Sequence, residues 1–184
     1  MLVRNLLLVA LAALLTTATL PAAAERPLDG DCDDSGVVVC AGMDLGASVQ
    51  CSVALDGSDA SCAWTFGALS AAFSPLALPG HESHVVTGTI TICTPGQACS
   101  TTPFSHEASC AWAPAFECGD SYGPNPGATD PVTLLDGECV TVTVALSGTI
   151  DAEVVDPALS LATVSFSNEG GDAGSACFYS NGRD

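Results

Sequence analysis

Positively charged side chains are nearly missing from this chain of 184 residues. It has no lysine and only three arginines against 21 acidic residues, which gives a formal net charge of −18. A surface of this charge repels nucleic-acid phosphates and anionic membranes, and it attracts cations or a basic partner. We therefore expect no nucleic-acid partner, and the lack of a long apolar run after the N-terminal stretch predicts no membrane span in the mature chain.

Large side chains and helical patterns are also scarce. The chain has only six phenylalanines, two tryptophans and two tyrosines, so its hydrophobic core is thin. Disulfides, at about 2–4 kcal/mol each, would then supply much of the stability. Apart from a short helical turn near Ala68 to Phe73, no segment combines a helical period with caps.

The N-terminus has the three parts of a secretory signal peptide. Arg4 precedes an apolar stretch from Leu6 to Leu15, and the small residues Ala22-Ala23-Ala24 follow. We expect cleavage after Ala24, so that residues 1–24 are removed and 25–184 form a single secreted domain. This mature chain sets two arginines against 21 carboxyl groups, a net charge of −19.

All ten cysteines follow the leader, which predicts five disulfides in an oxidising extracellular compartment. If Asp56-Gly57 forms a two-residue hairpin turn, Cys51 lies opposite Cys62 at disulfide distance. Spacing favours Cys51–Cys62, Cys139–Cys177, Cys32–Cys40, Cys99–Cys110 and Cys93–Cys118. The competing local arrangement joins Cys93 to Cys99 and Cys110 to Cys118.

Alternating apolar residues indicate β-strands almost throughout. The clearest are Val85 to Cys93, with Val86, Ile90 and Ile92 on one face, and Cys139 to Leu146. Weaker candidates are Val37 to Cys40, Ser48 to Leu55, Ser61 to Phe66, Ala108 to Trp112, Leu159 to Ser167 and Ala176 to Ser180. Turn signals separate them at Asp56-Gly57, Pro79-Gly80, Pro95-Gly96, Asp136-Gly137 and Asn168 to Gly171. The fold expected is all-β, a disulfide-rich antiparallel β-sandwich that is loosely immunoglobulin-like.

The tetrapeptide Ser-Cys-Ala-Trp occurs twice, at Ser61 to Trp64 and at Ser109 to Trp112. Each copy places its cysteine eleven residues after another one. The repeat indicates an internal duplication of 37–80 and 85–131, and chance recurrence is the alternative. If the duplication is real, Trp64 and Trp112 are expected to pack against their neighbouring disulfides in related positions.

A serine motif, Gly119-Asp120-Ser121-Tyr122-Gly123, fits the Gly-x-Ser-x-Gly pattern of nucleophile elbows. Such an elbow needs a helix after the serine and a histidine later in the chain. Here Gly123 to Gly127 is rich in proline and glycine, and no histidine follows His106. We therefore expect no catalytic residue and interpret the segment as a loop tethered by Cys118.

Two groups of residues contain side chains that could bind a cation. Asp29, Asp31, Asp33 and Asp34 resemble the start of a calcium loop, but the glycine and glutamate of a complete EF-hand are absent, which favours a solvated acidic N-terminus. His81 to His84, with His106-Glu107, contains enough imidazoles for zinc. Strand positions three apart point to opposite faces, so His81 and His84 could not bind one ion from a strand. We expect them to be loop residues beside a strand, and no metal or other cofactor is predicted.

These observations favour a secreted, non-catalytic interaction or structural module. The Cys-Ala-Trp step at Cys62 to Trp64, in a small acidic secreted sandwich, resembles the enediyne chromophore apoproteins, although no cysteine follows Trp64 at the short distance that their first loop needs. That resemblance implies the alternative of a small-molecule carrier with an apolar cavity. A weak calcium-binding domain and a protease inhibitor presenting Ser121 to Thr129 are further alternatives.

Overall fold

The computed structural model describes residues 39–55, 57–74, 78–112, 118–154 and 162–180. Over these ranges the chain forms eight β-strands and no helix. The strands are β1 (Cys40–Val53), β2 (Asp59–Phe73), β3 (Gly80–Cys93), β4 (Ser100–Trp112), β5 (Cys118–Ala128), β6 (Val132–Thr133), β7 (Cys139–Val154) and β8 (Ala162–Cys177). The predicted signal peptide lies outside the described residues.

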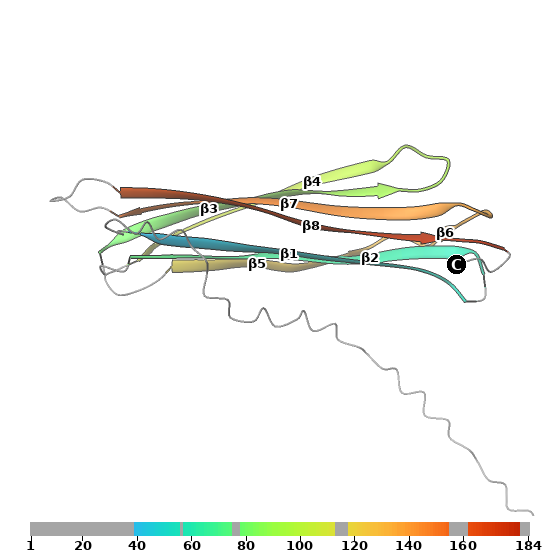
Figure 1. Cartoon of the computed structure of the whole chain (residues 1–184), viewed down its shortest axis with the longest axis horizontal. Helices are drawn as coiled ribbons and strands as arrows, with labels where there is room; N and C mark the ends of the chain where they lie inside the picture. Colours follow the sequence, from blue (N-terminus) through green and yellow to red (C-terminus); the bar gives the residue numbers. More distant parts are fainter. Residues whose placement is uncertain (1–38, 56, 75–77, 113–117, 155–161, 181–184) are drawn as a thin grey trace, which may run out of the picture.

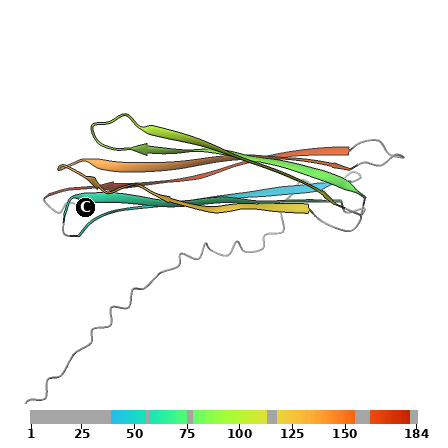
Figure 2. The same cartoon turned by 180° about the vertical axis from the view of Figure 1, so that it is seen from behind.

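Two antiparallel sheets contain all eight strands. One has the order β1-β2-β5, with the short β6 also paired to β2, and the other has the order β4-β3-β7-β8. The sheets lie face to face as two layers, with their long strands along the longest axis of the molecule (Figures 1 and 2). The all-β, sandwich-like fold expected from the sequence is therefore present.

The core lies between the two layers. In β7 every second residue from Val140 to Val154 is buried, in phase with the predicted alternation. Met43 of β1 packs with Val86 of β3 and Ile150 of β7 in one cluster. Because these residues come from both sheets, their burial holds the layers together.

Several segments predicted as turns or loops are strands. The helical turn predicted near Ala68 to Phe73 is wrong, because β2 continues through it with Ser70 and Ala72 buried, paired on both sides with β1 and β5. The Gly/Pro loop predicted after Cys118 is the edge strand β5, a position that tolerates proline because one side of the strand needs no partner. The turn predicted at Asn168 to Gly171 lies inside β8.

One irregularity in the β2–β5 pairing determines which β5 side chains face inward. Phe66 pairs with Asn125, but Ala68 pairs with Tyr122, so two residues of β5 stand opposite Gly67. Such a bulge reverses the alternation of the strand. The partly buried positions of β5 accordingly change from 120 and 122 before the bulge to 125 and 127 after it.

Three disulfides join described cysteines. Cys51–Cys62 and Cys139–Cys177 form between directly opposed strand residues, as predicted. The predicted Cys99–Cys110 and Cys93–Cys118 pairs are wrong, because Cys99 is bonded to Cys93 across the turn that joins β3 to β4. Cys40 and Cys110 are disulfide-bonded as well. The predicted Cys32–Cys40 bridge involves Cys32, which lies outside the described residues.

The two copies of Ser-Cys-Ala-Trp occupy different places. The first lies near the start of β2 and the second at the end of β4. Cys62 is bonded to the cysteine eleven residues before it, whereas Cys99, the cysteine eleven residues before Cys110, is bonded to Cys93. Trp64 packs with the Cys51–Cys62 cysteines in one hydrophobic cluster, as predicted. The side chain of Trp112 is outside the described part of the chain.

Candidate functional site

Polar side chains from both sheets meet between the layers, near the end of the molecule where β2 passes into β3. The group, here called the histidine–carboxylate cluster, consists of Ser70 of β2, Glu82 and His84 of β3, His106 of β4 and Asp120 of β5. Ser70, Glu82 and His84 are buried. A thin hydrophobic core thus gives way here to titratable groups, which are costly to bury without partners.

The alternation of β3 selects which residues enter the cluster. Glu82 and His84 point inward with Val86, whereas His81 points to the outer face and lies 3.4 Å from a carboxylate oxygen of Glu153. The prediction that His81 and His84 are loop residues is wrong, because β3 begins at Gly80 and contains both. On this strand they point to opposite faces, as positions three apart must.

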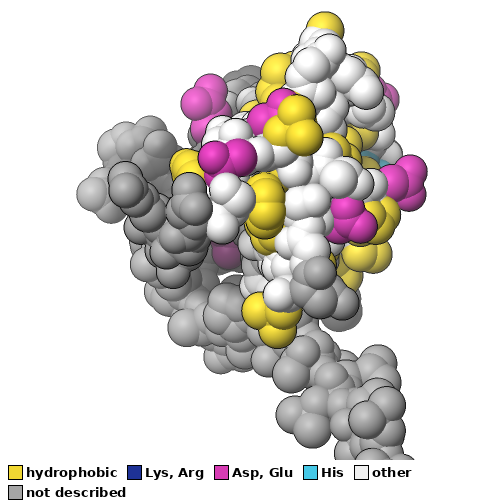
Figure 3. Space-filling view, turned by 90° about the vertical axis from the view of Figure 1, so that its right-hand side faces the viewer, with side chains coloured by type: hydrophobic (Ala, Val, Ile, Leu, Met, Phe, Trp, Pro, Cys, Tyr) yellow, Lys and Arg dark blue, Asp and Glu magenta, His cyan; other side chains and the backbone are white. Residues whose placement is uncertain are grey.

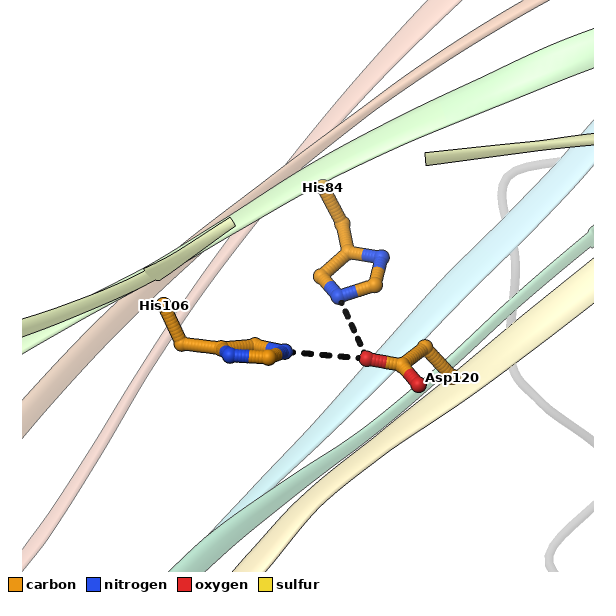
Figure 4. A group of neighbouring side chains, drawn as sticks. All are labelled: His84, His106 and Asp120. Carbon is orange, nitrogen blue, oxygen red and sulfur yellow. Dashed lines mark hydrogen bonds and ion pairs between the residues drawn. The ribbon is translucent and has the colours of Figure 1, made fainter. Parts of the chain in front are cut away.

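Both histidines point at one oxygen of Asp120 (Figure 4). The Nε2 atom of His84 lies 3.1 Å from Asp120 Oδ2, and the Nε2 atom of His106 lies 3.0 Å from the same oxygen. His84 and His106 belong to one sheet and Asp120 to the other. The cluster therefore joins the two layers through side chains.

The buried side of His84 faces a second carboxylate. Its Nδ1 atom lies 3.5 Å from Glu82 Oε1 and 3.3 Å from the hydroxyl of Ser70, which also lies 3.3 Å from Glu82 Oε1. Burial raises the pKa of Glu82, although the charge of His84 and the Ser70 hydrogen bond oppose this effect. The other carboxylate oxygen, Oε2, is buried without a hydrogen-bond partner.

The other side of the cluster is open to solvent. The side chain of Asp120 is 38% exposed and that of His106 is 30% exposed, against 4% for His84. The hydrogen bond from His106 lowers the pKa of Asp120 below its ordinary value. The imidazole of His106 stacks on the ring of Tyr122 with centroids 4.3 Å apart, which fixes its plane.

A cavity of about 80 Å³ adjoins the cluster, lined by Glu82, His84 and Asp120 together with Ala108, Ser109, Cys110 and Gly119. It has room for a water molecule or small ion, but not for an organic ligand of ordinary size.

Two imidazoles and a carboxylate form a donor set suited to a metal ion or to a hydrogen-bonded ion cluster. The potential ligand atoms of His84, His106 and Asp120 all lie within 4.8 Å of one another. The described ranges contain no other group of three such residues.

Other candidates from the sequence lie elsewhere. Ser121 is exposed and neighbours Asp120 on the strand, so it points away from both histidines. Asp29, Asp31, Asp33 and Asp34 fall outside the described residues. Sequence reasoning missed Ser70 and Asp120 as members of the cluster, and no motif in the sequence links them to the histidines.

Comparison with protein-family models, curated proteins and solved structures finds no match for this chain. In the described ranges, no helix is long and apolar enough to cross a membrane. The function must therefore be argued from the geometry of the chain itself.

Proposed function

We propose that the protein is a secreted, non-catalytic interaction or structural module with an immunoglobulin-like sandwich. The observation that carries this proposal is the filled core between the sheets. Side chains from both layers are fully buried there, among them Ala60 and Ala72 of β2 and Val142 and Ile150 of β7. A sandwich of this kind offers its outer surface and its loops, and not an interior chamber, for contact with partners.

The order of the strands supports an immunoglobulin-like topology. With β1 as strand A, β2 as B and β5 with β6 as E, the first sheet has the order A-B-E. With β4 as C′, β3 as C, β7 as F and β8 as G, the second has the order C′-C-F-G. These neighbour relations are those of immunoglobulin-type sandwiches.

The disulfides depart from the antibody pattern. Antibody domains join strands B and F by a bridge between the sheets. Here Cys62 of β2 is bonded to Cys51 of β1, and Cys139 of β7 is bonded to Cys177 of β8. Each of these bridges therefore stays within its own sheet. The proposal therefore concerns architecture and makes no claim of descent from antibody domains.

A carrier of small molecules is less well supported. Such a protein needs an apolar cavity of roughly 300–1,000 Å³. Between the described parts of the sheets, the cavity at the histidine–carboxylate cluster measures about 80 Å³ and is lined partly by ionisable groups. A hollow of about 340 Å³ is lined by residues of β3, β7 and β8 of one sheet, such as Thr87, Ala145 and Glu169, and so is not a chamber between the layers.

The surface indicates what kind of partner the module would contact. All three arginines lie outside the described residues, so no lysine or arginine balances the acidic side chains of the described surface. Figure 3 shows acidic groups among apolar and uncharged ones on one face, with no lysine or arginine among the side chains of the described residues. Such a surface favours a basic or cationic extracellular partner.

The test begins with protein that has been exported and oxidised. Its intact mass should correspond to a chain starting at Glu25, and its native mass spectrum should show no bound organic molecule. The protein is then used to capture partners from its native extracellular medium at low and high salt. We expect basic partners that are released by salt and that bind more weakly to a variant carrying D44N, E107Q and D130N, three exposed positions.

Two results would contradict this proposal. A stoichiometric organic molecule that leaves only on denaturation would favour the carrier. Capture that is equal at both salt concentrations and unchanged in the triple variant would show that the acidic surface is not the contact.

A further inference from the structure

We propose that His84, His106 and Asp120 bind one divalent transition-metal ion of the zinc class, and that this ion ties the two sheets together. The site would use Nε2 of each histidine and a carboxylate oxygen of Asp120. This inference does not depend on which partner the module contacts.

The distances already approach those of a metal site. Zinc binds imidazole nitrogen at about 2.0–2.1 Å and carboxylate oxygen at about 2.0–2.2 Å, so neighbouring ligand atoms around a tetrahedral ion are roughly 3.3 Å apart. The two nitrogens lie 3.1 and 3.0 Å from Asp120 Oδ2. Small side-chain movements would place an ion among the three atoms, which converge from three different strands (Figure 4).

The surroundings of His84 favour a metal at Nε2. A neutral imidazole has only one N–H, yet His84 has a carboxylate near each nitrogen: Asp120 at Nε2 and Glu82 at Nδ1. With a metal at Nε2, the single proton stays on Nδ1, where the Ser70 hydroxyl accepts it at 3.3 Å and in turn donates to Glu82, whose Oε1 lies 3.5 Å from the same nitrogen. A carboxylate behind a metal-bound histidine is a recurrent arrangement that fixes the ring and strengthens its metal bond.

The site also has access and room for a fourth ligand. Solvent reaches it from the side of Asp120 and His106, which are partly exposed. The adjoining cavity of about 80 Å³ borders His84 and Asp120 and can hold a water molecule as the remaining ligand. Two carboxylates of the cluster, Glu82 and Asp120, supply negative charge for the ion, and no described lysine or arginine competes with it.

The donor set indicates the class of metal. Imidazole suits zinc, copper or nickel, whereas calcium and magnesium prefer oxygen ligands. Cysteine does not compete as a ligand in the described part of the chain, because no free thiol is found there.

The position of the site explains what the ion would do. Three of the disulfides, Cys51–Cys62, Cys93–Cys99 and Cys139–Cys177, each join neighbouring segments of a single sheet. The metal would link β3 and β4 of one sheet to β5 of the other. Binding that is specific to the folded state raises stability by mass action.

The proposal can be tested by titrating zinc into the oxidised mature protein after chelator treatment. Millimolar magnesium in the buffer keeps exposed carboxylates occupied. We expect one zinc per chain. At zinc concentrations a hundredfold above the dissociation constant, the midpoint of thermal unfolding should rise by about 5–10 °C.

Variants identify the site. H106Q and D120N each remove a ligand and should weaken zinc binding by about 100-fold or more, whereas E82Q should weaken it by about 10-fold. H81Q is the matched control, since His81 lies on the same strand but on the outer face, and its affinity should stay within twofold of the parent. Circular dichroism and a count of free thiols establish that each variant has folded.

The zinc site can also be tested on the unsubstituted protein, so that the result does not depend on whether a variant folds. The chain has only three histidines, so their ring-nitrogen NMR signals can be followed individually during the zinc titration. The signals of His84 and His106 should move and those of His81 should not. The proposal fails if the protein binds no zinc, if H106Q and D120N bind it as the parent does, or if only the His81 signals respond; the cluster would then be a hydrogen-bonded ion cluster alone.

Discussion

Gly88 shows how closely single residues limit the packing between the layers. A Cβ atom at this position would lie 2.4 Å from the carbonyl oxygen of Ala145 and 2.4 Å from the ring of Phe104. That ring lies across Gly88 and stacks on Phe66, with centroids 4.4 Å apart. The glycine is therefore needed for an aromatic contact that joins the two sheets.

We predict that Gly88→Ala lowers the free energy of unfolding by about 1–3 kcal/mol, the usual cost of overpacking a filled site. Gly46→Ala is the matched control, because it is also a strand glycine but has no atom within 4 Å of the added Cβ. It should be neutral or stabilise by roughly 0.5–1 kcal/mol. Denaturant unfolding with intact disulfides measures both, and equal effects would contradict the close packing at Gly88.

The residues of the candidate site were only partly predictable. The alternation of β3 places His81 and His84 on opposite faces, and this can be read from the sequence. The inward position of Asp120 cannot, because it depends on a bulge opposite Gly67 and on β5 forming a strand despite its prolines. The approach of β5 to β3 and β4 is a tertiary contact between two sheets, for which local patterns carry no information.

At the scale of elements, the hairpin of β1 and β2 was the most predictable feature. A two-residue turn at Asp56-Gly57 predicts the register of this hairpin, and Val53 pairs with Ala60 and Cys51 with Cys62 as expected, although Asp56 itself lies outside the described residues. Strand lengths were much less predictable. Segments rich in alanine, glycine and serine, such as Ala68 to Ala72 and Asn168 to Gly174, lack β-propensity, yet pairing with neighbouring strands makes them extended.

The disulfides should differ in their contribution to stability according to the length of chain that they close. Cys139–Cys177 spans 38 residues, Cys51–Cys62 spans 11 and Cys93–Cys99 spans 6. The chain-entropy relation gives about 3.9, 2.8 and 2.2 kcal/mol respectively. Replacing each pair by alanine and measuring denaturant unfolding should reproduce this order, and a larger loss for Cys93–Cys99 than for Cys139–Cys177 would contradict it.

Strands should also differ in how often their hydrogen bonds open. β7 lies in the middle of its sheet, pairs with β3 and β8, and buries every second residue from Val140 to Val154. β5 lies at an edge and contains a bulge. We predict that amide hydrogens of β7 exchange most slowly, at rates governed by global unfolding, and that those of β5 exchange faster by at least about 100-fold. Similar protection of both strands would show that the edge opens only when the whole domain unfolds.

At the scale of the whole molecule, calcium binding by the acidic N-terminal residues can be tested through its effect on thermal unfolding. Asp29, Asp31, Asp33 and Asp34 lie outside the described residues, and their solvated state remains a prediction. If it is correct, millimolar calcium should raise the midpoint of thermal unfolding no more than magnesium at the same ionic strength, because only binding to the folded state stabilises it. A calcium-selective rise of several degrees would make these four residues calcium ligands.

The net charge of the chain, −18, should by itself reduce the stability of the folded domain. The carboxylates repel one another more strongly in the compact state than in the unfolded chain, where they are farther apart. Sodium chloride screens this repulsion, because the Debye length falls from about 30 Å at 0.01 M to about 8 Å at 0.15 M. We predict that the midpoint of thermal unfolding rises by a few degrees over this range, since about 1 kcal/mol corresponds to roughly 2–4 °C for a domain of this size.

The D44N, E107Q and D130N variant, which has three fewer charges at exposed positions, should start from a higher midpoint and gain less from salt. A midpoint that falls with added salt, or an equal gain in both proteins, would mean that contacts between individual charges outweigh the repulsion of the whole surface.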